Sequence, residues 1–116
     1  MGSMEFACKV AGSKVVLVMG HTACGAIKGA IDGVQLGNLT ALLAKIRPAV
    51  EATHFTGERS AKNYPFVDAV ARKNVALTIA NIREKSPVLR DLESNGSIKI
   101  AGSMYNLETG AVQFLA

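Results

Sequence analysis

The chain has 116 residues and a net charge of +4, and 49% of its residues are hydrophobic whereas 19% are charged. This length predicts one domain over residues 1–116, and the composition excludes a disordered chain because it supplies enough apolar surface for a core. The basic residues are scattered and are not interleaved with stacking aromatics, so we expect no nucleic-acid partner. No apolar run reaches the length of a membrane span, and the first residues lack the features of a signal peptide, so we expect no membrane partner.

The chain opens with a helical pattern followed by a buried strand. Apolar side chains in residues 5–10 have helical spacing, and Gly12 ends that helix. The run Val15–Met19 is unbroken and rich in β-branched residues. Such a run predicts a strand covered by helices on both faces, as in parallel α/β sheets.

Three helical segments and a polar loop are predicted next. Small residues from Cys24 to Ile31 indicate a short helix packed closely against a neighbour. Asn38 is expected to cap the following helix, and Pro48 either kinks that helix or restarts it. Residues 54–65 are polar and indicate a loop.

The second half predicts two helices and two strands. A long helix is expected over Phe66–Lys85, and Ser86-Pro87 has the cap and first-turn proline of a new helix. Residues 98–105 indicate a strand, and Val112 to Phe114 pair back on it as a hairpin. Five arginines are expected to be solvated surface charges: Arg47, Arg59, Arg72, Arg83 and Arg90.

This element order predicts an α/β fold. Two apolar strands joined through helices imply a right-handed parallel crossover, and the last strand adds an antiparallel edge. The result is a truncated, mainly parallel sheet flanked by helices, with a C-terminal antiparallel hairpin strand.

Two cysteines, Cys8 and Cys24, do not form a disulfide framework. Both lie in apolar or glycine-rich contexts, which favours a reducing, cytoplasmic compartment.

The segment with most chemical information is Gly20-His21-Thr22-Ala23-Cys24-Gly25, directly after the first strand. Imidazole and thiolate are preferred ligands of Zn²⁺, and a strand-to-helix turn lets His21 and Cys24 face one ion. Backbone N–H groups at the helix start favour the thiolate. The spacing alone leaves a second interpretation open, in which the histidine lies in a surface turn and the cysteine is inert.

Several further motifs occur in a recognisable order along almost the whole chain. They are Ser3-Met4-Glu5-Phe6-Ala7, the strand Val15–Met19, Gly20-His21-Thr22-Ala23-Cys24-Gly25-Ala26, Asn38-Leu39, Val70-Ala71-Arg72-Lys73-Asn74-Val75, Ser86-Pro87-Val88-Leu89, residues 98–105 and Thr109-Gly110. In this order the chain resembles the β-class carbonic anhydrases.

The resemblance implies a mainly parallel sheet, a homodimer or larger assembly, and hydration of CO₂ to bicarbonate. In the family, two cysteines and one histidine hold Zn²⁺, and His21 and Cys24 match the second half of that ligand set. The ion lowers the pKa of water toward neutrality, and the resulting hydroxide attacks CO₂.

The sequence departs from the family in its missing first half. It contains no Cys-x-Asp-x-Arg motif, which in the family supplies the other thiolate and an Asp–Arg pair. The strands that carry this motif are also missing, including the one that lies beside Val15–Met19. Cys8 is expected to be a small buried hydrophobic residue rather than a third ligand, and His54 an ordinary exposed histidine.

Three functional hypotheses follow from this incomplete site, and none assigns a catalytic residue. In the first, the chain is an enzyme whose site is completed by a partner subunit or by further residues. In the second, it is a non-catalytic module that binds zinc or self-associates. In the third, it is a fragment of a longer product. For the chain alone we expect weak or absent hydration, since two protein ligands seldom give Zn²⁺ catalytic geometry. We also expect a homo-oligomer, because the missing strand leaves an apolar sheet edge that strand pairing or exchange of the N-terminal helix would bury. Two His21 and Cys24 pairs meeting across a dimer axis would make a shared Cys₂His₂ site.

Overall fold

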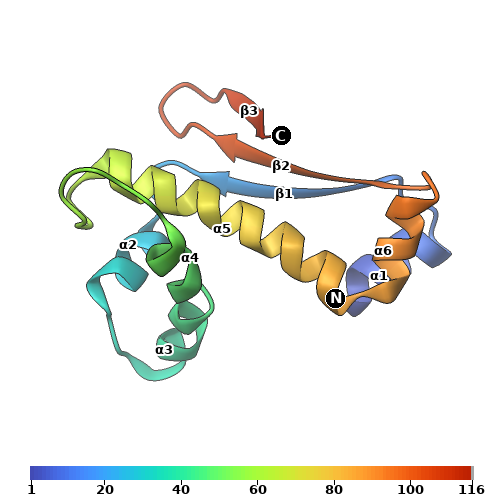
Figure 1. Cartoon of the computed structure of the whole chain (residues 1–116), viewed down its shortest axis with the longest axis horizontal. Coiled ribbons are helices and arrows are strands. Elements are labelled where there is room, and N and C mark those ends of the chain that lie inside the picture. Colours follow the sequence, from blue (N-terminus) through green and yellow to red (C-terminus); the bar gives the residue numbers. More distant parts are fainter. Residues whose placement is uncertain (116) are drawn as a thin grey trace.

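Helices cover one face of a three-stranded sheet in the computed structural model, which describes residues 1–115 (Figure 1). In chain order the elements are α1 (Gly2–Glu5), the π-helix η1 (Phe6–Val10), β1 (Val15–His21), α2 (Gly25–Asp32), α3 (Gly37–Ala44), α4 (Arg47–Ala52), α5 (Tyr64–Lys85), α6 (Pro87–Ser94), β2 (Lys99–Tyr105) and β3 (Val112–Leu115). No helix within this part of the chain is both long and apolar enough to cross a membrane.

The sheet has the order β1-β2-β3. Strands β1 and β2 pair in parallel from Val15 opposite Lys99 to His21 opposite Tyr105. Strand β3 pairs antiparallel with β2, with Gly102 opposite Leu115. The predicted α/β fold, with a parallel pair and an antiparallel C-terminal strand, is confirmed. Strand β1 lies at the edge of the sheet, and its outer side pairs with no strand in residues 1–115.

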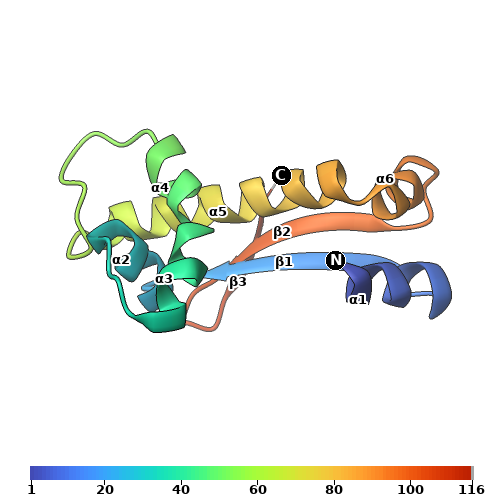
Figure 2. The ribbon, with the colours of Figure 1, turned by 90° about the horizontal axis from the view of Figure 1, so that it is seen from below.

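Helix α5 packs lengthwise against the sheet, as Figure 2 shows from a second direction. Its side chains Val67, Val70 and Val75 are almost fully buried. The approach is closest at two strand glycines, because a Cβ atom at Gly20 would lie 2.9 Å from Val75 Cγ2 and one at Gly102 would lie 2.9 Å from Val75 Cγ1. The absence of side chains at these two positions therefore permits the helix to lie against the sheet.

Gly102→Ala is expected to lower the free energy of unfolding by about 1–3 kcal/mol, because overpacking forces side chains and backbone apart. The added Cβ would meet Val75 Cγ1 at 2.9 Å and Ile79 Cδ1 at 3.0 Å, and valine has little rotamer freedom to withdraw. Urea denaturation measures the change. Gly25→Ala is the matched control, since no heavy atom lies within 4 Å of its added Cβ. Equal stability of both variants would contradict the close helix–sheet packing.

The other face of the sheet is bare, which corrects the prediction that Val15–Met19 is covered on both faces. Val15, Leu17 and Met19 are 57%, 43% and 50% exposed, and Phe114 of β3 is 69% exposed. The alternation along β1 directs these residues away from α5. Figure 1 draws the helices on one side of the strands and none on the other.

The helix boundaries confirm the cap at Ser86 and correct the one at Asn38. Ser86 Oγ accepts a hydrogen bond from the Leu89 N–H at 3.1 Å, as its Ser-Pro motif predicts. Helix α3 instead begins at Gly37, so Asn38 lies within its first turn. The Leu36 N–H donates to Thr40 Oγ1 at 2.8 Å, so a side chain inside the helix satisfies this terminal donor.

Two other expected boundaries near proline are resolved by the structure. Pro48 lies in the first turn of α4, which confirms a restarted helix and not a kink. The long helix starts at Tyr64, two residues before its expected start, with Pro65 in the first turn. Proline suits this position because its missing N–H has no helical partner there.

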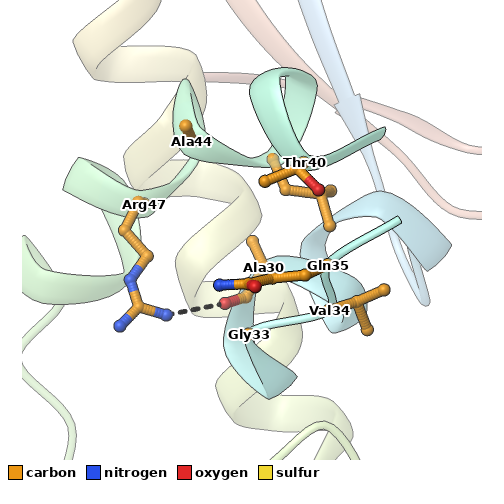
Figure 3. A pocket seen from close by; sticks show the side chains of 8 residues that line it. Ala30, Gly33, Val34, Gln35, Thr40, Ala44 and Arg47 are labelled. Carbon is orange, nitrogen blue, oxygen red and sulfur yellow. Dashed lines mark hydrogen bonds between the residues drawn. The ribbon is translucent and has the colours of Figure 1, made fainter. Parts of the chain in front are cut away.

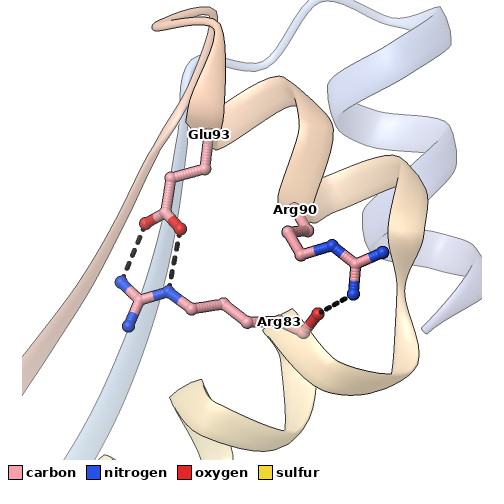
Figure 4. A network of polar contacts seen from close by, with 3 residues as sticks. All are labelled: Arg83, Arg90 and Glu93. Carbon is pink, nitrogen blue, oxygen red and sulfur yellow. Dashed lines mark hydrogen bonds and ion pairs between the residues drawn. The ribbon is translucent and has the colours of Figure 1, made fainter.

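All five arginines are exposed, as expected, and four of them also make specific hydrogen bonds. Arg83 Nε and Nη2 each donate to a carboxylate oxygen of Glu93 at 2.8 Å, and Arg90 Nη1 donates to the Arg83 carbonyl at 3.2 Å (Figure 4). The hydrogen bonds from Arg83 hold the pKa of Glu93 below its usual range. These contacts connect α5 to α6 near the surface, where an ion pair contributes only about 0.2–1 kcal/mol.

Candidate functional site

The turn between β1 and α2 carries both residues singled out by the sequence. His21 is the last residue of β1, and Cys24 directly precedes α2 with an extended backbone. Between them, Thr22 fixes the turn to the sheet. Its N–H donates to the Tyr105 carbonyl at 3.0 Å, and its Oγ1 accepts from the Leu107 N–H at 3.0 Å. The parallel neighbour β2 and the loop after it thus hold one side of the turn.

Ala23 has a strained backbone. Its φ of 52° is the only positive φ of a residue other than glycine in residues 1–115. This left-handed conformation costs an L-residue about 1–2 kcal/mol, so the surroundings must stabilise it. The Ala23 N–H donates to Asp68 Oδ1 at 3.0 Å, across 45 residues of sequence.

The His21 ring leaves one nitrogen for a ligand. Its Nδ1 lies 2.9 Å from the Thr22 carbonyl oxygen. A carbonyl only accepts, so Nδ1 carries the proton in this bond and Nε2 of the neutral ring has a free lone pair. The backbone therefore selects the tautomer in which Nε2 is the available donor atom to a metal.

His21 and Cys24 line the same cavity, which has a volume of about 250 Å³. Its walls come from the end of β1, the start of α2 and the middle of α5. The lining residues are Val18, Met19, Gly20, His21, Cys24, Ile27, Ile46, Ala71, Asn74, Val75 and Thr78. Asn74 and Thr78 are the other polar side chains of the lining, and the Thr78 hydroxyl donates to the Asn74 carbonyl at 2.7 Å. The rest of the wall is mainly apolar.

His21 and Cys24 have the ligand types of a zinc site, but they are fewer than the protein ligands that such a site normally has. Imidazole nitrogen and thiolate suit Zn²⁺, whereas a catalytic site normally has three protein ligands. No group of three histidine, cysteine, aspartate or glutamate side chains within residues 1–115 is arranged to hold a metal ion. The described part of the chain therefore offers at most two of the three protein ligands, and we assign it no hydration step of its own.

The other two candidate residues lie elsewhere. Cys8 is only 7% exposed and packs with Ile82 and Leu89, whereas Cys24 packs against the other core cluster. Cys8 is thus a buried apolar residue, as expected. His54 is exposed in the loop after α4, also as expected.

A second cavity, of about 440 Å³, lies between α2, α3 and α4 (Figure 3). Arg47 is its one charged side chain, and its Nη1 donates to the Ala30 carbonyl at 3.2 Å. The remaining lining is aliphatic, glycine, threonine and glutamine. This second cavity contains no histidine, cysteine or carboxylate. The cavity at His21 and Cys24 is therefore the stronger functional candidate.

Sequence reasoning missed Asp68 as part of this site. The sequence did contain one indication of its role. Asp68 is three residues before Ala71 and seven before Val75, so it lies on the same face of α5 as these two buried residues. An acidic side chain on the apolar face of a helix requires a hydrogen-bond partner. The partner itself could not be inferred, because only folding brings α5 to the turn.

Comparison with known proteins finds carbonic anhydrases. A family model described as carbonic anhydrase matches residues 1–112. A carbonic anhydrase of Pseudomonas aeruginosa is 30% identical in an alignment of 118 positions that covers 97% of this chain and 51% of the relative. Carbonic anhydrase 2 of Mycobacterium tuberculosis is 27% identical over 95% of this chain and 53% of its own length. The chain thus spans about half the length of the curated relatives it matches.

Solved structures show the same similarity. The Coccomyxa β-carbonic anhydrase in complex with acetazolamide superposes with a TM-score of 0.82 at 25% identity, covering 99% of this chain and 52% of that one. A tetrameric β-carbonic anhydrase of Sordaria macrospora also has a TM-score of 0.82, at 22% identity over 99% of this chain and 58% of that one. The second match, at this identity, supports the fold alone.

Proposed function

Because the chain belongs to the β-carbonic anhydrase family, we propose that His21 Nε2 and Cys24 Sγ are two ligands of a zinc site that hydrates CO₂ once other residues complete it. The main support for this proposal is that both side chains line one cavity and that the Thr22 carbonyl, by binding Nδ1, leaves Nε2 of His21 free. Zinc would supply Lewis-acid activation of water in this cavity. The apolar wall would limit water, and Asn74 and Thr78 offer polar contacts to a small substrate.

The completing residues are proposed to come from another polypeptide segment. The chain covers about half of its relatives, and its sequence lacks the Cys-x-Asp-x-Arg motif of the family. Residues 1–116 would then form one domain that lacks the N-terminal part of the family fold. The two free cysteines suit a reducing, cytoplasmic compartment.

Self-association is a second candidate function, supported by the bare sheet face and the free edge of β1. The seven residues of β1 contain no Lys, Arg, Asp, Glu or Pro, and these are the residues that commonly protect strand edges from pairing. The tetrameric Sordaria macrospora enzyme shows that a similar fold assembles into oligomers. We propose that two copies pair antiparallel through β1.

This pairing would separate the two candidate metal sites. If Val18 lies at the centre, His21 of one copy faces Val15 of the other, and the two His21 residues are about 20 Å apart along the strands. A shared Cys₂His₂ site is therefore incompatible with centred β1 pairing. Zinc stoichiometry distinguishes these assemblies, because a shared site binds one ion per two chains.

Zinc titration tests the ligand assignment. Cys24→Ser is expected to weaken zinc binding by roughly 100-fold or more, since losing a ligand should cost at least as much as losing an outer-shell partner. Cys8→Ser is the matched control and should bind like the unmodified chain, because Cys8 lies in the other core cluster. Competition with a chromophoric chelator measures both affinities. Loss of binding in Cys8→Ser with retention in Cys24→Ser would overturn the assignment.

A further inference from the structure

We infer that Asp68 is a positioning residue that fixes the geometry of the His21–Cys24 turn through the backbone of Ala23. The bond from the Ala23 N–H to Asp68 Oδ1, at 3.0 Å, joins the centre of the turn to a helix 45 residues away. The inference rests on the proposed function for its consequence, which is the correct orientation of two zinc ligands.

Asp68 belongs to a rigid part of the fold. Its neighbours Val67 and Val70 are fully buried, and Ala71 is only 3% exposed. Within residues 1–115 the Asp68 carboxylate makes no ion pair and no other hydrogen bond, so its one contact is with the turn. A carboxylate accepting from a backbone N–H forms a charge-assisted bond, which is stronger than a bond between neutral groups.

The hydrogen bond from Ala23 to Asp68 is made at the residue of the turn that has the strained backbone. Ala23 has its φ at 52°, in the region that residues with a Cβ rarely adopt. Thr22 is held from the side of β2, and Asp68 holds the next residue from the side of α5. If Ala23 relaxed to a negative φ, the chain would change direction just before Cys24. The thiol would then lose its fixed position relative to the His21 ring.

Asp68 is not itself a third ligand. The described residues contain no group of three potential ligand side chains, so Asp68 does not join His21 and Cys24 around one point. Its effect on a metal must therefore pass through Ala23.

The experiment uses Asp68→Ala, Asp68→Asn and the matched control Glu84→Ala, each in a Cys8→Ala background so that Cys24 is the only thiol. Glu84 is an exposed acidic residue of the same helix without an ion pair or side-chain hydrogen bond in residues 1–115. Asparagine retains an oxygen that accepts from the Ala23 N–H. Circular dichroism first establishes that each variant is folded.

Asp68→Ala should increase hydrogen exchange at the Ala23 amide by about tenfold or more and accelerate Cys24 alkylation by iodoacetamide. Asp68→Asn should remain within about threefold of the parent chain in both measurements, because it keeps the hydrogen bond. Glu84→Ala should match the parent. Zinc affinity should fall about 10- to 100-fold in Asp68→Ala, the range for lost outer-shell partners.

Ala23→Gly distinguishes a specific effect on the turn from a general loss of stability. Glycine adopts positive φ without strain, so Ala23→Gly should reverse part of the exchange and alkylation changes caused by Asp68→Ala. Additive effects of the two substitutions, or an unchanged Ala23 amide in Asp68→Ala, would overturn the inference. If Asp68→Ala does not fold, failure of Asp68→Asn to preserve Ala23 protection would also overturn it. If the parent chain binds no zinc, the proposed function fails, but exchange and alkylation still decide the role of Asp68.

Discussion

The chain alone, supplied with excess zinc, is expected to hydrate CO₂ at least about 1,000-fold more slowly than a complete β-carbonic anhydrase, a difference of about 4 kcal/mol in activation free energy. The physical reason is ligand number. The proposed ligands His21 and Cys24 would supply two donors, and the described residues contain no set of three. The missing thiolate would also have supplied negative charge that helps to retain the ion. Stopped-flow measurement with a pH indicator determines the rate.

Addition of a polypeptide that carries the Cys-x-Asp-x-Arg segment should raise this rate if it completes the site. The matched control is Cys24→Ser, which should remove the gain, whereas Cys8→Ser should retain it. A rate for the unaided chain comparable to that of the complete enzyme would show that the two-ligand description is wrong. A gain that survives Cys24→Ser would instead place the activity in the added polypeptide.

Leu17→Lys is expected to shift the chain from an oligomer toward the monomer, with a dissociation constant at least about tenfold higher. Leu17 is 43% exposed at the centre of the bare sheet face, between Val15 and Met19. In the centred β1 pairing Leu17 faces Met19 of the other copy, so a lysine there replaces an apolar cross-strand contact with a charge, and charged side chains commonly protect edge strands from pairing. Light scattering across micromolar concentrations measures the mass.

Leu42→Lys is the matched control for that substitution. Leu42 is 53% exposed on α3, away from the sheet, so the same change of side chain should leave the mass unaltered. A stable monomer of the parent chain at micromolar concentration would contradict association through β1. Equal dissociation by both variants would place the interface elsewhere.

The local elements of this protein follow directly from short stretches of sequence. The run Val15–Met19 predicts β1, and Ser86-Pro87 predicts the start of α6, because strand preference and helix capping depend on neighbouring residues. The parallel pairing of β1 with β2 follows from strands joined through helices. The His-x-x-Cys spacing likewise indicates the turn whose residues His21 and Cys24 line the cavity.

The sequence was less informative where long-range packing decides. An unbroken apolar run does not reveal how many layers cover it, so the exposed face of β1 appeared only in the structure. Asn38 is a good capping residue by type, but Thr40 satisfies the N–H of Leu36 and the helix begins earlier.

Sequence alone is enough to identify most helices and strands, their order and the candidate ligands His21 and Cys24. Only folding brings Asp68 of α5 to Ala23 and places His21 and Cys24 in one cavity with residues of α5. The difference arises from the separation in sequence between the residues that interact. Strand and helix preferences act over a few residues, whereas the strained turn is stabilised by a hydrogen bond across 45 residues, which forms only after the helix has packed on the sheet.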